Sequence, residues 1–207
     1  MGDTYYVFYI KKPGNESTPT VTRLIDVPKD LTAELTARGS ALDNQGDYPG
    51  ALQAYENALK LNQNYAPAWV GKGKALADIA LSNHQNNYYD AINAYDRAIE
   101  IDPVYALAWC DKAAALYLQG NYNESIRAFD IATTLDPTFA IAWWGKGNAF
   151  SYQGNYGEAI NAYSRSVELN PYAGYAWYDL SNALSKIGRI EEANAVFAKA
   201  KELGYTG

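Results

Sequence analysis

Glycine and lysine alternate at Gly71-Lys-Gly-Lys74, which invites comparison with a phosphate-binding loop. Such a loop needs two glycines separated by four residues and followed by Lys and then Ser or Thr, so that backbone N–H groups surround the phosphates. The spacing here does not meet that requirement. The triplet recurs at Gly145-Lys-Gly147, within another stretch expected to be helical. We therefore expect these glycines to serve helix packing and not phosphate binding.

The chain contains one histidine, His84, and one cysteine, Cys110. Nucleophilic triads require a histidine beside the nucleophile, and zinc sites require several Cys or His ligands, so this pair supplies neither. The acidic pair Glu191-Glu192 falls at an expected helix start, where the helix dipole favours negative charge. The sequence therefore predicts no catalytic residue, no metal site and no cofactor, and we expect a protein that is not an enzyme.

A repeat along the chain is the stronger signal. Trp69, Trp109, Trp143 and Trp177 stand 40, 34 and 34 residues apart, and similar residues surround each of them. Self-similarity at such a spacing indicates a repeat architecture. Aligned on the tryptophans, the chain divides into five units at 32–65, 66–105, 106–139, 140–173 and 174–207. The second unit has six additional residues, near 80–85.

Each unit contains two alanine-rich stretches that favour helix. Turns such as Gln119-Gly-Asn-Tyr122 separate the two stretches, because Gly ends one helix and Asn caps the next. Position 8 of each unit is a small residue, and one position in the second stretch of each unit is always aromatic. One helix pair cannot bury its apolar face alone, so stacked pairs must form the core. The aromatic residues are Tyr55, Tyr95, Phe129, Tyr163 and Phe197.

The tryptophans, the small and aromatic positions, and Pro103, Pro137 and Pro171 at the unit ends resemble the tetratricopeptide repeat family. The resemblance extends over residues 32–207. It implies an all-α, right-handed superhelical solenoid of five helix-turn-helix units. It also implies a non-catalytic protein-interaction scaffold, in which the first helix of each unit lines a concave groove through positions 2, 5, 6, 9, 12 and 13.

The groove positions are polar or mixed in the first two units and become apolar and aromatic in the third to fifth. Trp144 stands out because Trp143 already fills the core position beside it. We predict that a protein or extended peptide with apolar or aromatic side chains binds there; the alternative is that these aromatics only pack on neighbouring helices. The predicted contact residues are Cys110, Asp111, Tyr117, Trp144, Asn148, Tyr152, Tyr178, Asp179 and Asn182.

Charge excludes several partner classes. The family's clamp for acidic C-terminal tails needs Lys and Asn at fixed groove positions, but Asp111 and Asp179 occupy position 6, so we expect no such tail to bind. A net charge of −6 with scattered acidic residues argues against nucleic acid. No apolar run approaches the roughly 18 residues of a membrane span. No signal peptide is recognisable, so the cytoplasm is the default expectation, and export of a longer protein stays open.

Residues 1–31 are predicted to be a separate strand or hairpin segment with a linker. Residues 4–10 are β-branched and aromatic, which is typical of a strand, and 21–27 resemble a second strand. An isolated hairpin is marginally stable in water. We therefore expect it to cap the first unit, to belong to an upstream domain, or to pair with another chain. The last case gives the alternative function, a self-associating structural element that forms a homo-oligomer through residues 4–10.

Overall fold

A computed structural model describes residues 31–85 and 87–205. Within these ranges the chain forms ten α-helices and no strand, so the predicted all-α solenoid is confirmed. The predicted hairpin over residues 4–27 lies outside the described residues. The helices are α1 (Leu31–Asn44), α2 (Tyr48–Leu61), α3 (Ala66–Ser82), α4 (Tyr89–Ile101), α5 (Ala106–Leu118), α6 (Tyr122–Leu135), α7 (Ala140–Tyr152), α8 (Tyr156–Leu169), α9 (Gly174–Lys186) and α10 (Ile190–Glu202).

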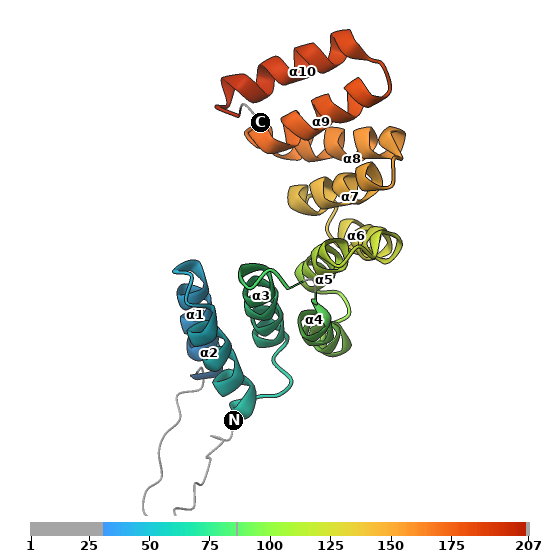
Figure 1. The fold of residues 1–207 in the computed structure, drawn as a ribbon. Helices are drawn as coiled ribbons and strands as arrows, with labels where there is room; N and C mark the ends of the chain where they lie inside the picture. The colour runs from blue at the N-terminus through green and yellow to red at the C-terminus, as the bar shows by residue number, and fades with distance from the viewer. Residues whose placement is uncertain (1–30, 86, 206–207) are drawn as a thin grey trace, which may run out of the picture.

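Each helix packs against the next one in the chain, and the helix pairs stack into an arc (Figure 1). The first helices α1, α3, α5, α7 and α9 also contact one another, whereas the described second helices make no such contacts with each other. The first helices are therefore closer together and line the inner, concave face of the arc. Groove positions in the sequence are positions on these helices.

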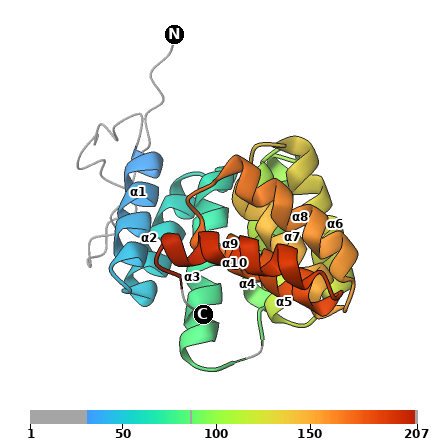
Figure 2. The same ribbon diagram turned by 90° about the horizontal axis from the view of Figure 1, so that it is seen from above.

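The turns within the pairs end their first helices with a left-handed residue. Gly46, Gly120, Gly154 and Gly188 have φ values of 76° to 86°, which only glycine adopts at little cost. In the second unit, where the extra residues lie, α3 runs to Ser82 and His84 takes the left-handed place with φ 53°. The insertion thus lengthens both α3 and its turn, which project to one side of the solenoid (Figure 2).

Each tryptophan fixes the turn that precedes its helix. The indole N–H of Trp109 donates to the carbonyl of Pro103 at 3.0 Å, and Trp143 bonds to Pro137 in the same way at 3.1 Å. The side chain of Asp136 accepts the backbone N–H of Thr138 at 2.9 Å, which holds the turn around that proline. The recurring Trp and the recurring Asp-Pro therefore act together, because the indole N–H bonds to the carbonyl of the proline in the turn.

The Gly-Lys-Gly triplets are packing positions, as predicted. A Cβ built on Gly71 would lie 2.2 Å from the ring of Tyr55, and one on Gly145 would lie 2.3 Å from Phe129. The lysine between the two glycines pairs with the preceding helix: Lys146 Nζ lies 2.6 Å from Asp130 and 5.0 Å from the ring centroid of Trp143. Glycine admits the neighbouring aromatic ring, and lysine bridges consecutive units beside it.

We predict that Gly145→Ala lowers the free energy of unfolding by about 1–3 kcal/mol, because the added methyl group displaces the buried Phe129 ring. The matched control is Gly157→Ala in α8, where a Cβ meets nothing within 4 Å. The control should stabilise the fold by about 0.5–1 kcal/mol through helix propensity alone. Urea denaturation measures both. Equal, stabilising effects would show that ring contact does not set the helix spacing.

Candidate functional site

The candidate site is the concave face of α5, α7 and α9. Positions 5, 9 and 13 of each unit lie four residues apart, so they share one face of each helix. The structure leaves the predicted residues in three states of exposure. Cys110 is buried; Tyr152 and Asn182 are exposed; and Asp111, Tyr117, Trp144, Asn148, Tyr178 and Asp179 are half-buried.

Three tyrosines meet where α5 ends and α6 begins. The ring centroids of Tyr117 and Tyr152 are 5.5 Å apart in an edge-on contact, and Tyr122 lies 4.9 Å from Tyr152. Tyr152 is 66% exposed, so this cluster offers aromatic surface at one end of the face. Tyr122 belongs to the recurring Gln-Gly-Asn-Tyr turn, a signal that could have added it to the predicted set.

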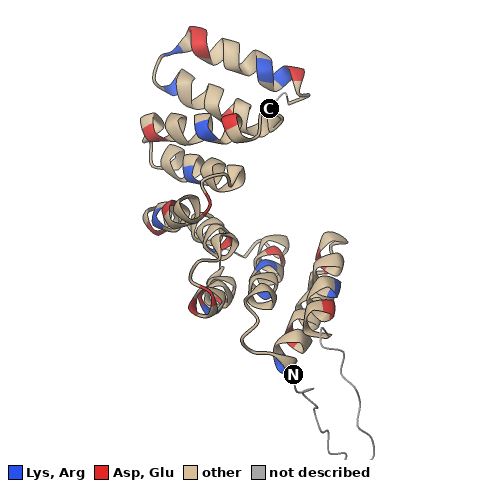
Figure 3. Cartoon of the chain, turned by 180° about the vertical axis from the view of Figure 1, so that it is seen from behind, with Lys and Arg blue, Asp and Glu red and all other residues tan. Residues whose placement is uncertain are grey.

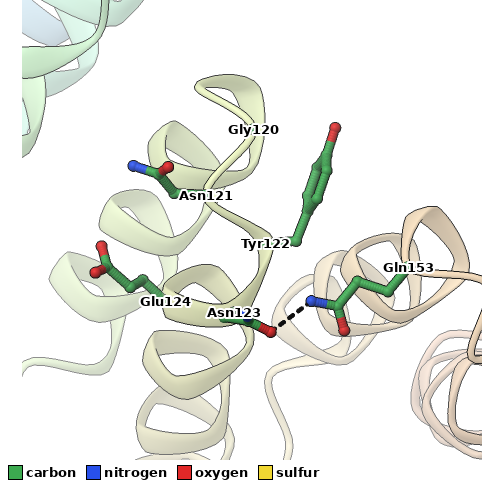
Figure 4. Close-up of a pocket in the computed structure, with 6 residues that line it drawn as sticks. All are labelled: Gly120, Asn121, Tyr122, Asn123, Glu124 and Gln153. Atoms are coloured by element: carbon green, nitrogen blue, oxygen red, sulfur yellow. Dashed lines mark hydrogen bonds between the residues drawn. The ribbon is translucent and has the colours of Figure 1, made fainter.

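A shallow pocket of about 280 Å³ lies beside this tyrosine cluster (Figure 4). Gly120 and the first turn of α6 form one wall, and Gln153 at the end of α7 forms the other. The amide of Gln153 donates to Asn123 Oδ1 at 2.7 Å, which links the two units. Its lining combines the ring of Tyr122 with polar side chains of α6, of the end of α7 and of the turn before α6.

Trp144 and Asp179 are joined directly across consecutive units. The indole N–H of Trp144 donates to Asp179 Oδ2 at 2.8 Å, and the Trp144 ring lies 4.9 Å from that of Tyr175, edge-on. Burial raises the pKa of the Asp179 carboxyl, and the Trp144 hydrogen bond partly offsets that effect. The Trp144 side chain is therefore partly buried and partly exposed, and its hydrogen bond and ring contact fix its orientation.

Polar groups complete the face towards the last unit. Asn148 accepts the hydroxyl of Tyr163 at 2.7 Å. Asn182 occupies the same position in the fifth unit, where the aromatic partner is Phe197, which has no hydroxyl. Tyr178 lies 6.0 Å from Phe197 and 5.1 Å from Tyr205 between ring centroids. The exposed amide of Asn182 therefore has no equivalent of the Asn148 hydrogen bond and can meet a ligand.

Cys110 is a correction to the predicted set. Its side chain is 5% exposed and packs in the core with Phe129, because a small apolar side chain at position 5 sinks between helices. Burial, with the negative charge of Asp111, raises the pKa of the thiol to about 12. Cys110 is therefore neither a contact surface nor a reactive thiolate.

A charged cluster at the other end of the concave face contains the predicted Asp111 and three residues that the sequence reasoning did not select. Lys74 Nζ of α3 lies 2.5 Å from Asp43 Oδ2 of α1. Asp78 and Asp111 act on the same lysine through their charges. All four residues occupy groove positions 6, 9, 12 or 13, so their positions in the repeat could have identified the cluster from the sequence. The predicted face thus extends from an acidic end on α1, α3 and α5 to an aromatic end on α5, α7 and α9.

Three further observations concern metal donors, apolar helices and the distribution of charge. In the part of the chain that the structure describes, no three His, Cys, Asp or Glu side chains are placed to hold a metal ion. None of the described helices is long and apolar enough to cross a membrane. Over the same residues, Figure 3 shows Lys and Arg interspersed with Asp and Glu and no continuous basic stripe. The concave face itself presents aromatic rings and carboxylates.

Comparison with known families gives three matches along the chain. Models described as tetratricopeptide repeat match residues 106–139 and 144–204, and one described as TPR repeat matches 39–79 and 83–120. None of the curated proteins compared with the sequence matches it.

Solved structures share the fold. A crystal structure of MamA is 27% identical, with a TM-score of 0.68, and the match covers 80% of this chain and 94% of that one. MamA from Desulfovibrio magneticus RS-1 is 19% identical, with a TM-score of 0.69 and coverage of 84% and 96%. PilF from Pseudomonas aeruginosa is 18% identical, with a TM-score of 0.76 and coverage of 86% and 78%.

The buried carboxyl of Asp111 predicts a pH-dependent stability. Burial raises its pKa to about 7 from an ordinary value of 3.8, with Lys74 opposing the rise and Asp78 adding to it. The folded state therefore holds this proton more tightly than the unfolded state. Its stabilising effect is complete below about pH 4 and is lost as pH rises through 7.

Between pH 5 and 8 the wild type should lose about 2 kcal/mol more unfolding free energy than Asp111→Asn, measured by urea denaturation. Asp90→Asn, which removes an exposed carboxylate from α4, is the control and should follow the wild type. The same pH profile in Asp111→Asn and the wild type would contradict the assignment.

Proposed function

The chain belongs to the tetratricopeptide repeat family, and we propose that it is a non-catalytic scaffold that binds an extended peptide or protein segment on its concave face. Scaffolding of protein–protein contacts is the general role that this fold serves. The finer part of the proposal is the site: aromatic side chains of α5, α7 and α9 receive apolar and aromatic side chains of the segment.

The observation that supports this site most is the exposure of aromatic rings along consecutive first helices. Tyr152 is largely exposed, while Tyr117 and Trp144 are partly so and are held by ring and hydrogen-bond contacts. Rings that are already fixed lose little conformational entropy on binding, so they make effective anchors. The exposed amide of Asn182 also supplies hydrogen-bonding groups for an extended backbone.

The charges of the site favour a cationic segment. Asp179 contributes a carboxylate beside Trp144, and Asp111 contributes another at the same unit position on α5. Opposite charge supports association, and its effect weakens as salt screens it. We therefore expect bound segments to combine apolar or aromatic residues with basic ones and to exclude acidic tails.

We predict that Trp144→Ala combined with Tyr178→Ala weakens binding of peptides selected from a random library by about tenfold or more, because two anchors are lost. Fluorescence anisotropy on the full chain measures the change. Tyr172→Ala, which removes a tyrosine that is 84% exposed in the turn before α9, is the control and should bind as the wild type.

Circular dichroism melting of each variant separates loss of binding from loss of fold, and Trp144→Phe keeps the apolar body while removing the indole N–H. Selected sequences that are predominantly acidic, or unchanged affinity in the folded double variant, would contradict the proposed groove.

A further inference from the structure

Asp111 and Asp179 occupy the same position in the third and fifth units, yet only one of them has a donor. Asp179 accepts the indole N–H of Trp144, which comes from position 5 of the preceding unit. The corresponding residue before Asp111 is Val70, which has no donor and is buried. Among the described residues no hydrogen bond or ion pair reaches the Asp111 carboxylate. The same acceptor therefore occurs twice in the described units, once with a hydrogen-bond donor at Asp179 and once without one at Asp111.

The surroundings of Asp111 add negative charge. Lys74 is the cation that acts on Asp111 within the described residues, and its ammonium group pairs with Asp43, whose side chain is only 1% exposed. The other oxygen of that carboxylate, Asp43 Oδ1, is buried without a partner in the described ranges. Asp78 faces the same lysine but forms no ion pair within the part of the chain that the structure describes. Three carboxylates from α1, α3 and α5 therefore share one cation on the concave face.

We propose that Asp111 binds a lysine or arginine side chain of the segment on the concave face. Asp78 lies beside this site, and Lys74 stays in its ion pair with Asp43. This inference rests on the proposed function and names the chemistry of its partner. The bound cation supplies to Asp111 the N–H donor that Trp144 supplies to Asp179. The segment runs from the acidic end of the face on α1, α3 and α5 to the aromatic end on α7 and α9.

An organic cation fits this site better than a metal ion. The carboxylates belong to three different helices and do not form a set of metal donors. An ammonium or guanidinium group carries several N–H donors and tolerates such a spread-out arrangement. The negative charges of Asp43, Asp78 and Asp111 also act on the buried hydroxyl of Tyr95. Burial and these charges together raise the pKa of that hydroxyl well above its ordinary value.

The site couples binding to pH. The groups that face Asp111 are Lys74 and Asp78 from α3, Tyr95 from α4, Tyr105 just before α5, and Cys110 on its own helix. Burial raises the pKa of Asp111 to about 7, and a bound cation favours the ionised form of its carboxyl. Cation binding therefore strengthens as pH rises from 6 to 8, in contrast to the intrinsic stability of the fold.

The test uses the full chain and ten-residue peptides selected from a library with random apolar and aromatic positions around one fixed arginine. Each selected peptide is resynthesised with citrulline, in which a neutral urea group of similar shape replaces the guanidinium, and both dissociation constants are measured at pH 6 and pH 8. We expect the arginine peptide to bind about tenfold or more tightly than its citrulline form at pH 8, since a charge-assisted hydrogen bond is lost. The ratio should be smaller at pH 6.

Asp111→Asn should abolish both the arginine preference and its pH dependence, whereas Asp90→Asn should keep them. Tyr178→Ala reports separately on the aromatic groove and keeps the hydrogen bond from Trp144 to Asp179: it should weaken arginine and citrulline peptides equally and leave their ratio unchanged. An undiminished ratio in Asp111→Asn, or no arginine preference in the wild type, overturns the cation anchor. Unchanged binding in Tyr178→Ala overturns the groove alone, and if no peptide binds, both proposals are overturned.

Discussion

In the first four units an aromatic ring packs against a neighbouring helix at a glycine, and this contact sets the distance between the helices. The ring of Tyr55 lies against both Gly39 of its own unit and Gly71 of the next, and Phe129 lies against Gly145. Because interiors are close-packed, a ring in a backbone groove permits only a narrow range of helix separations. The curvature of the arc, and therefore the width of the concave face, follows from these contacts.

This constraint also explains where charge can enter the concave face. Position 6 is glycine in the second and fourth units, where the preceding ring fills the space, and aspartate in the third and fifth. A carboxylate at that position lies between two units and loses much of its hydration, which raises the pKa of both Asp111 and Asp179. Each of these carboxylates then needs a donor, and residues 31–85 and 87–205 provide one only for Asp179.

The sequence predicted the architecture well because the same residues recur in register. Trp109 and Trp143 each bond to a carbonyl six residues earlier, and such local geometry repeats wherever its residues repeat. The candidate site was less predictable, since its details depend on residues in different units. The hydrogen bond from Trp144 joins residues 35 apart, and the burial of Cys110 depends on the size of its neighbours. Asn121, which the pattern favours as a helix cap, makes no capping bond and lies beside Gln119.

The contacts between helices have a consequence for cooperativity. Every described helix touches only helices of its own unit or the adjacent ones, so the stability of the array is a sum of unit terms and nearest-neighbour interface terms. Opening of an end unit therefore leaves distant interfaces intact, and the array can lose structure stepwise. A segment that spans α5, α7 and α9 adds contacts between units that do not otherwise touch. Its binding would convert separate local openings of the last three units into a single all-or-none transition.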